Sequence, residues 1–411
     1  MKYGIWPAFL VIAIALSAGC GKPGKTQGVL FKDDAAFLKE HTQAVILTAR
    51  DNLAQVAVNP DLQGRVMTST ADGPDGLSFG WINREALASG GNNPHINAFG
   101  GEDRFWLGPE GGQFSIFFKK GAAFDLEHWF TPPPINEQAY EVVDRKADRV
   151  RFRKDMRLVN YSGTAFEVEL YREVRILKPE EVKALGVPVP AGVKMVAFAS
   201  DNQVTNIGVR PWSKDTGLLS IWILGMFNPS PATTIVVPFK PGPEAELGPI
   251  VNDAYFGKVP ADRLIVRDED GVLFFSGDGK YRSKIGVSPR RVKPFAGSFD
   301  AANKVLTIVH LTIPEGATDY VNSMWKIQDD PFAGDVVNSY NDGPAAPGAK
   351  PLGPFYELES SSPAVALRPG GILAHVHTTM HFQGPDQALD EIARAVLCVG
   401  IADIGRAFAK K

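Results

Sequence analysis

Two neighbouring stretches of the chain alternate between apolar and charged residues with a period of two. Through residues 150–158 every second side chain is apolar except Lys154, and the intervening ones are charged. On one face of the second stretch lie Phe166, Val168, Leu170, Val174 and Ile176, and glutamates dominate the other face. This period predicts two half-buried strands that form a hairpin around Tyr161–Gly163. The charged faces are then solvated sheet surface with arginine–glutamate pairs across the strands.

Short apolar runs recur along the rest of the chain, separated by glycine and proline. We expect further strands at 44–49, 53–60, 64–70, 194–206, 218–227, 233–239, 263–268, 272–277, 304–313, 355–360 and 372–382. The 41 glycines and 31 prolines are spread between these runs rather than clustered. Many short strands with turn signals between them predict an all-β sandwich or barrel.

Three stretches have helical patterns. Residues 31–41 can begin with an aspartate cap, residues 178–186 have Pro179 near the start and Gly186 as the stop, and residues 385–400 carry an apolar face. We expect short helices that decorate the sheets and one C-terminal helix. The Gly/Pro-rich residues 341–353 predict a long loop. Because strands continue after it, residues 31–411 are interpreted as one domain.

The N-terminus resembles an export signal. One lysine, an apolar run and small residues precede Cys20, and the "LSAGC" segment resembles a bacterial lipobox. We therefore predict a signal peptide at 1–19, lipidation of Cys20 and a tether at 20–30, with the protein anchored to a cell-envelope membrane and facing the periplasm or the exterior. An ordinary cleaved signal peptide is the alternative. Cys398 is the other cysteine, so a lipidated Cys20 leaves no disulfide.

Charge and motifs exclude several functions. The net charge of −3 does not predict nucleic-acid binding, which requires a strongly basic surface. The sequence holds no phosphate-binding P-loop, no GxSxG, no HExxH and no paired CxxC. Readings as a nucleotide-dependent enzyme or a serine hydrolase therefore lack support, and no cofactor is expected.

The segment "NAFGGEDRFWLGPEGGQ" (97–113) has the composition of a sugar site. Its glycines allow the backbone to approach a ligand, and Asn97, Glu102, Arg104 and Glu110 can bond hydroxyl groups. The indole of Trp106 offers a flat apolar plane for the C–H face of a sugar ring. The alternative is a turn-rich connection between strands in which glutamate and arginine pair with each other.

Two further segments carry candidate acids and bases. His128 follows Glu127 and precedes a tryptophan, so its imidazole can be tuned for acid–base work; the alternative is a surface pair. Glu357 and Glu359 point to the same side if 355–360 is a strand. They are either an acid/base or hydroxyl-binding pair, or the solvated face of an edge strand.

The "HVHTTMH" segment places three histidines on one face of a predicted strand. At ~3.3 Å per residue, His375 and His381 stand roughly 20 Å apart. At most His375 and His377 could therefore share a site, and further ligands would have to come from elsewhere. We predict no metal centre.

Four segments, in order, resemble the galactose mutarotase-like (aldose 1-epimerase-like) superfamily. They are "LAQVAVNPDLQGRVMTSTADG" (53–73), "NAFGGEDRFW" (97–106), "QVTNIG" (203–208) and "FYELESSSPAVALRPGGI" (355–372). Whole phrases are also similar to a family of bacterial lipoproteins of this fold without an assigned function. The resemblance implies a β-supersandwich, with a carbohydrate bound on the concave face of its larger sheet.

The resemblance also implies roles for single residues. Glu359 falls at the general base of the epimerases, and Gly100 with Gly101 matches the glycine pair of their substrate loop. This chain has Phe99 where the epimerases have a loop histidine, and Ile207 where they have the histidine that acts as general acid. Classical mutarotation therefore lacks its acid, for which His128 is the candidate replacement.

The sequence thus predicts an exported lipoprotein that binds a carbohydrate and modifies it by acid/base chemistry, epimerase-like before lyase or hydrolase. Glu359 and His128 would be catalytic, and the remaining candidates would bind the sugar: Asn97, Glu102, Arg104, Trp106, Glu110 and Glu357. The alternative is a non-catalytic glycan-binding or structural envelope lipoprotein.

Overall fold

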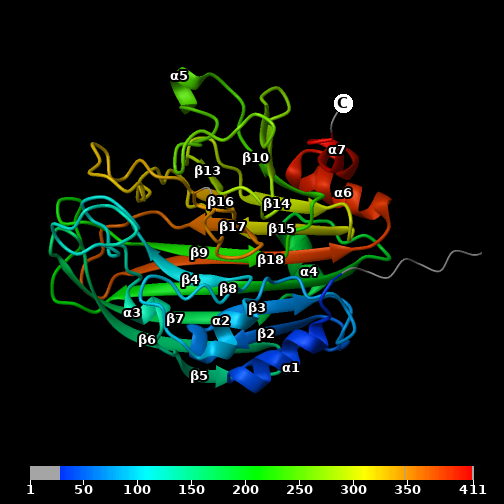
Figure 1. The fold of residues 1–411 in the computed structure, drawn as a ribbon, viewed down its shortest axis with the longest axis horizontal. Helices are drawn as coiled ribbons and strands as arrows, with labels where there is room; N and C mark the ends of the chain where they lie inside the picture. Colours follow the sequence, from blue (N-terminus) through cyan, green and yellow to red (C-terminus); the bar gives the residue numbers. More distant parts are fainter. Residues whose placement is uncertain (1–27, 347, 410–411) are drawn as a thin grey trace, which may run out of the picture.

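The computed structural model describes residues 28–346 and 348–409 (Figure 1). The predicted signal peptide, the predicted lipidation at Cys20 and most of the 20–30 tether lie outside these residues. Among the helices of the described part, none combines the length and the apolar composition needed to cross a membrane. The predicted all-β architecture is confirmed, because antiparallel sheets form most of the regular structure.

The largest sheet has ten antiparallel strands. In spatial order they are β11 (Leu264–Arg267), β12 (Val272–Ser276), β10 (Thr233–Pro238), β14 (Phe295–Asp300), β15 (Val305–Leu311), β18 (Ile372–Gln383), β8 (Lys194–Asn206), β7 (Ala165–Ile176), β6 (Arg149–Val159) and β5 (Glu141–Arg145). The predicted hairpin is β6–β7, and its arginines pair with glutamates across the strands, as in Arg153–Glu169 at 2.6 Å and Arg157–Glu167 at 3.0 Å. These pairs lie on the exposed face, as the alternation predicts.

Two smaller sheets form a second layer. The five-stranded sheet has the order β13 (Ser283–Val287), β16 (Val337–Asn341), β17 (Tyr356–Ser361), β9 (Ser220–Phe227) and β4 (Arg104–Gly108). The three-stranded sheet consists of β1 (Val45–Thr48), β2 (Gln55–Asn59) and β3 (Arg65–Thr70). An antiparallel bridge between Val66 and Asp103 joins the start of β4 to the smaller sheet.

Apolar side chains fill the space between the layers. Phe152 and Val168 of the large sheet belong to the same buried cluster as Phe105 and Ile221 of the five-stranded sheet. A second interlayer cluster joins Phe275 of β12 to neighbouring parts of β13, β16 and β17. The five-stranded sheet therefore packs on both halves of the large sheet, which gives the molecule a sandwich core.

Helices cover the face of the large sheet that points away from the two smaller sheets. The structure contains α1 (Phe31–His41), α2 (Arg84–Ser89), α3 (Pro133–Asn136), α4 (Pro179–Ala184), α5 (Glu244–Leu247), α6 (Asp386–Leu397) and α7 (Ile401–Arg406), with a 3-10 turn at Pro60–Leu62. Leu389 and Ile392 of α6 pack on Phe274 and Leu306 of the large sheet. Figure 1 shows α6 and α7 together on one side of the molecule, whereas α1 lies beside β2 and β3 on the other.

The segment 97–113 differs from its sequence interpretation. Residues 104–108 form the buried strand β4 rather than a loop. A Cβ on Gly100 would lie 2.0 Å from the carbonyl oxygen of Trp81, and one on Gly101 would lie 2.7 Å from that of Val66. Both glycines also have positive φ angles, 92° and 109°. They allow backbone to pack on backbone, and the expected approach to a ligand is wrong for this pair.

Candidate functional site

One face of the five-stranded sheet carries most of the predicted site residues. Ser360 of β17 points toward the large sheet, where its hydroxyl contacts His375 and His377. Because side chains alternate along a strand, Glu357 and Glu359 point away from the large sheet. The prediction of a site on the concave face of the larger sheet is therefore wrong for Glu359, which lies on the outer face of the smaller sheet.

Glu359 is fully buried and held by two donors. Lys284 Nζ of β13 and Trp222 Nε1 of β9 each lie 2.9 Å from its Oε2 atom. Its Oε1 atom has no hydrogen-bond partner among the residues that the structure describes. The ammonium of Lys284 also lies 4.8 Å from the centre of the Trp222 ring. The two donors thus engage one carboxyl oxygen of Glu359 and leave the other to bond a ligand.

Glu357 and Arg104 form a looser pair beside Glu359. Arg104 Nη2 lies 3.6 Å from Glu357 Oε1, and the guanidinium lies 4.1 Å from the centre of the Trp106 ring. Arg104 Nε and Nη1 have no partners within the described chain. Burial, together with repulsion from Glu359, raises the pKa of Glu357 to about 8. Glu357 therefore keeps its proton at neutral pH, beside the Glu359 carboxyl that is paired with Lys284.

A third carboxyl, that of Glu110, joins this group from the loop after β4. Its backbone N–H donates to Ser323 Oγ over 3.2 Å. Burial is the main cause that raises its pKa to about 7, and repulsion from Glu359 adds to the rise, while Lys284 opposes it. We call Arg104, Glu110, Lys284, Glu357 and Glu359 the outer cluster.

Sequence reasoning missed the part of the site contributed by β9, β13 and β16. Trp222 lies on β9 and Lys284 on β13. Tyr255, from the loop before β11, packs beside them, and its hydroxyl donates to Asp335 Oδ2 over 2.6 Å and accepts from Asn338 Nδ2 of β16 at 3.1 Å. Lys284 is one of many lysines in the chain, and its strand, "SKIGV", has no pattern that singles it out.

Two loops cover the outer cluster. Gln113 Nε2 donates to the carbonyl of Gln328 at 2.8 Å, and Gln328 N–H donates back to Gln113 Oε1 at 3.0 Å. Trp325 stacks on Trp129 with 5.8 Å between ring centres. The space beneath, lined by Trp222, Lys284 and other residues, is about 10 Å³, which is room for about one water molecule.

Three predicted site residues lie elsewhere. His128 is bonded to Asp125 of its own loop at 2.7 Å, and this bond raises the pKa of His128. Asn97 bonds Asn92 and Asn136, so its amide organises the loop around it. Glu102 is fully buried and bonded to Ser69 and His381. In the described residues none of the three contacts the outer cluster through a hydrogen bond or ion pair.

His375 and His377 of β18 are explained by their hydrogen bonds between the sheets. Ser360 Oγ lies 2.8 Å from His375 Nε2 and 2.8 Å from His377 Nδ1. Burial lowers the pKa of His375 to about 3 and that of His377 to about 4, so both are neutral rings between the sheets. No group of three or more histidine, cysteine or acidic side chains in the described ranges is arranged to hold a metal ion.

Solved structures with a related chain trace are distant in sequence. A protein from Synechocystis has 12% identity and a TM-score of 0.49, with 83% of this chain and 96% of that chain covered. A galactose mutarotase-like protein from Lactobacillus casei has 10% identity and a TM-score of 0.43, covering 83% and 100%. A galactose mutarotase related enzyme from Lactobacillus acidophilus has 10% identity and a TM-score of 0.45, covering 83% and 98%.

Sequence comparison gives a family without an assigned activity. No curated protein matches the chain in sequence. One family model matches residues 29–408, which is nearly all of the described chain. The chain therefore belongs to the family of unknown function DUF6786.

Proposed function

We propose that the outer cluster binds a carbohydrate and acts on it by acid/base chemistry. The observation that carries this proposal is the pairing of Glu359 with Glu357 on one face of β17. Glu359 is ion-paired with Lys284 over 2.9 Å, whereas burial raises the pKa of Glu357 to about 8, so Glu357 keeps its proton at neutral pH. Neighbouring carboxyls in different environments commonly divide acid and base roles between them.

The spacing of the two carboxyls suits a sugar. Residues i and i+2 of a strand lie roughly 6.5 Å apart at ~3.3 Å per residue, a separation at which two carboxyls can flank one sugar. Glu359 Oε1 is positioned to accept the proton of a hydroxyl group, and Glu357 to return one to a neighbouring oxygen. Trp106 and Trp222 supply indole rings, and Arg104 supplies donors that lack protein partners in the described residues.

The covering loops set a condition on binding. A sugar ring is much larger than the present space of about 10 Å³, so the loops at 109–118 and 321–332 must separate before a sugar reaches Glu359. Loop motions of this kind occur on μs–ms timescales in many enzymes. Closure over a bound sugar would exclude water from the acid/base pair.

Polarimetry of freshly dissolved α-D-glucose and α-D-galactose, with saturation-transfer NMR on the same sugars, tests this proposal. We expect faster mutarotation with the wild-type protein and a loss of about 10²–10⁴-fold in Glu359→Gln, which keeps the shape of the side chain. The exposed Glu391→Gln variant should match wild type. We also expect the wild-type rate to fall above about pH 8, as Glu357 loses its proton. An equal rate in wild type and Glu359→Gln would contradict an acid/base role.

Non-catalytic glycan binding is the second candidate, and it is favoured by the closed cover and the locked Lys284–Glu359 pair. On this alternative, sugars bind to wild type without faster mutarotation, and Glu359→Gln retains binding. If no sugar binds or reacts, both candidates fail and a structural role in the envelope is the remaining reading.

We further propose that the protein is exported and lipidated on Cys20, on the basis of the sequence pattern alone. Cys20→Ser should release the protein from membranes into the soluble fraction and abolish labelling with a palmitate analogue. A wild-type protein that takes up no label would contradict lipidation.

A further inference from the structure

A second cavity lies between the two main sheets, away from the outer cluster. Its volume is about 220 Å³, and it shares no lining residue with the small space beside Lys284. Among its lining residues are Phe79, Phe227, Asp300, Thr307, Tyr356 and His381. The strands β9, β14, β15, β17 and β18 all reach it, so its walls are built on rigid elements.

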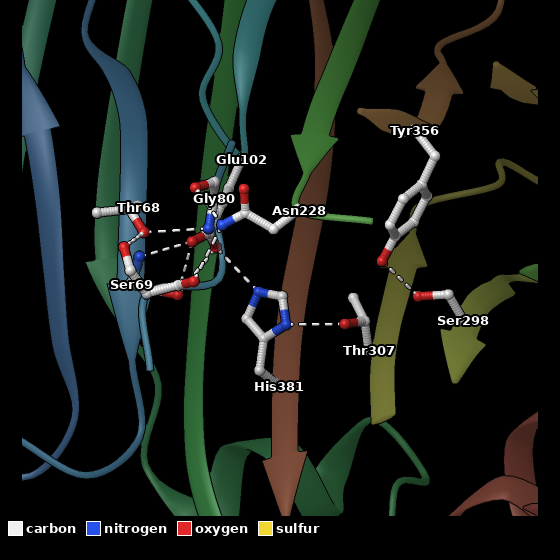
Figure 2. A network of polar contacts seen from close by, with 10 residues as sticks. Thr68, Ser69, Gly80, Glu102, Asn228, Ser298, Thr307, Tyr356 and His381 are labelled. Carbon is white, nitrogen blue, oxygen red and sulfur yellow. Dashed lines mark hydrogen bonds and ion pairs between the residues drawn. The ribbon is translucent and has the colours of Figure 1, made fainter. Parts of the chain in front are cut away.

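A chain of hydrogen bonds ends at this cavity (Figure 2). The Glu102 carboxylate accepts from the backbone N–H of Ser69 at 2.6 Å and from His381 Nε2 at 2.9 Å. On the other side of the ring, His381 Nδ1 lies 2.9 Å from Thr307 Oγ1. His381 and Thr307 line the cavity, and Glu102 does not. The Glu102 carboxylate lies on the side of the imidazole that is opposite Thr307.

The hydrogen bonds hold the His381 ring from both sides. A carboxylate only accepts, so His381 Nε2 donates to Glu102, and Nδ1 shares the second hydrogen bond with the Thr307 hydroxyl. Phe79 stacks on the His381 ring at 4.4 Å and 20°, and Phe227 packs against its edge at 5.6 Å. The imidazole is therefore fixed, and it holds the Thr307 hydroxyl at the wall of the cavity.

The lining residues define the class of ligand. No lysine or arginine is among the lining residues that the structure describes, and the Asp300 carboxylate is, so an anion is disfavoured. Phe79, Phe227 and Tyr356 offer apolar ring surfaces, and Thr307 adds a hydroxyl group. Asn228 and Asn303 add amides whose Nδ2 donors are bonded within the chain, which leaves their Oδ1 acceptors for a ligand. A volume of about 220 Å³ lies below the ~300–1,000 Å³ of drug-sized sites, which suits a single ring.

We propose that this cavity is a second small-molecule site, which takes a neutral cyclic polyol of about monosaccharide size. A ligand hydroxyl hydrogen-bonds to Thr307 Oγ1, which His381 Nδ1 holds in place, and Glu102 fixes the orientation of that imidazole. The aromatic walls contact the C–H face of the ligand ring. This site does not depend on the outer cluster, because it uses the opposite side of the five-stranded sheet.

Two pairs of matched variants test the site. Thr307→Val removes the hydroxyl at nearly constant shape, and its control is Thr379→Val on the neighbouring strand β18, where the buried hydroxyl has no partner within the described chain. Asn303→Trp fills the rim of the cavity, and its control is Ala302→Trp, the exposed preceding residue in the same turn. Neither rim variant touches the apolar core.

The probes are myo-inositol, D-glucose and D-galactose, with D-glucuronate and benzyl alcohol as comparators. Binding is followed through the side-chain ¹H–¹⁵N signals of His381, identified by their loss in His381→Gln. We expect at least one neutral polyol to shift the His381 signals, and D-glucuronate to bind more weakly. Thr307→Val should raise the dissociation constant of the polyol about tenfold, which is the usual scale of one lost hydrogen bond. Thr379→Val should raise it by less than twofold.

The outcomes separate this site from the outer cluster. Polyol binding that is lost in Asn303→Trp but kept in Ala302→Trp and Glu359→Gln supports the second site. Polyol binding that persists in Thr307→Val and Asn303→Trp but disappears in Glu359→Gln belongs to the outer cluster and overturns the proposal. Tight binding of benzyl alcohol with no response to any polyol overturns the proposed ligand class.

Discussion

Buried charged residues of this protein fall into two groups that differ in their partners. Arg172 has a full set: its guanidinium bonds the Asp103 carboxylate at 2.6 Å, the amide oxygen of Asn202 and the carbonyl of Gly64. Arg104 and Glu359 each retain polar atoms without partners in the described residues. The first group ties the sheets together, and the second is suited to bind a ligand.

Arg172→Met should strongly destabilise the fold, because it leaves the Asp103 carboxylate buried and without its cation. We expect the free energy of unfolding to fall by about 3–5 kcal/mol in urea titrations. The exposed pair Arg157–Glu167 provides the control, and Arg157→Gln should cost at most about 1 kcal/mol. Equal losses in both variants would contradict a special role for the buried pair.

The raised pKa of Glu357 predicts how stability depends on pH. The ordinary pKa is 4.5, and the folded value is about 8, so between these values the folded state holds a proton that the unfolded state has released. The free energy of unfolding therefore falls as pH rises through this window, by up to about 1.4 kcal/mol per pH unit. Glu110, with a pKa of about 7, adds to the fall below pH 7.

Glu357→Gln should remove this contribution, because the amide resembles the protonated acid. Urea titrations between pH 7 and 8, above the range of Glu110, give the cleanest comparison. The slope should flatten in Glu357→Gln and stay as in wild type in the exposed Glu391→Gln. A slope that is unchanged in Glu357→Gln would show that this carboxyl is already ionised in the folded protein.

Local pattern and chemical type were enough to predict some of the site residues, but not which residues lie together. Glu357, Glu359, Arg104, Trp106 and Glu110 were predicted as site residues, and the structure brings them together. Asn97, Glu102 and His128 have the same chemical types and lie elsewhere, because loop paths and strand pairings that no local pattern encodes decide their neighbours. Lys284 and Trp222 were missed for the same reason.

At the scale of elements, long periodic runs were predictable and short, doubly buried strands were not. The predicted stretch 194–206 coincides with β8, and 31–41 with α1. The strands β4, β5, β13, β14 and β16 were missed. All are five or six residues long. Apart from the exposed β5, most of their residues are buried on both faces, so they show no alternation. The polar residues of β16, "VNSYN", make this strand still harder to predict, because their hydrogen-bond partners come from elements that are distant in the sequence.

The helix α6 illustrates an element whose stability comes from packing on the sheet. Ile392 is fully buried against the large sheet, and Gln387 is exposed on the same helix. Ile392→Ala should lower the free energy of unfolding by about 2–5 kcal/mol, because it leaves a cavity in a packed interface. Gln387→Ala should change it by less than about 0.5 kcal/mol. Thermal and urea unfolding measure both, and similar small effects would mean that α6 is not part of the cooperative core.

At the scale of the whole molecule, one strand serves two different chemistries. The alternation along β17 points Glu357 and Glu359 outward beneath the covering loops, and Tyr356 inward to the cavity between the sheets. The five-stranded sheet thus separates a charged site on its outer face from a neutral, aromatic-lined cavity on its inner face. Their access also differs, since the outer site is closed by loops and the inner cavity is large enough for a ring.

The covering loops make a prediction for the whole molecule. Gln113 joins them through two hydrogen bonds with the backbone of Gln328, so Gln113→Ala should separate the loops while leaving the sheets intact. Hydrogen exchange should become faster at 109–118 and 321–332 and stay unchanged in β8 and β18. The partly exposed Gln43→Ala is the control. If opening limits access to the outer cluster, the same variant also binds sugars with a higher association rate. Faster exchange with an unchanged association rate would instead mean that sugars reach Glu359 by a path that these loops do not close.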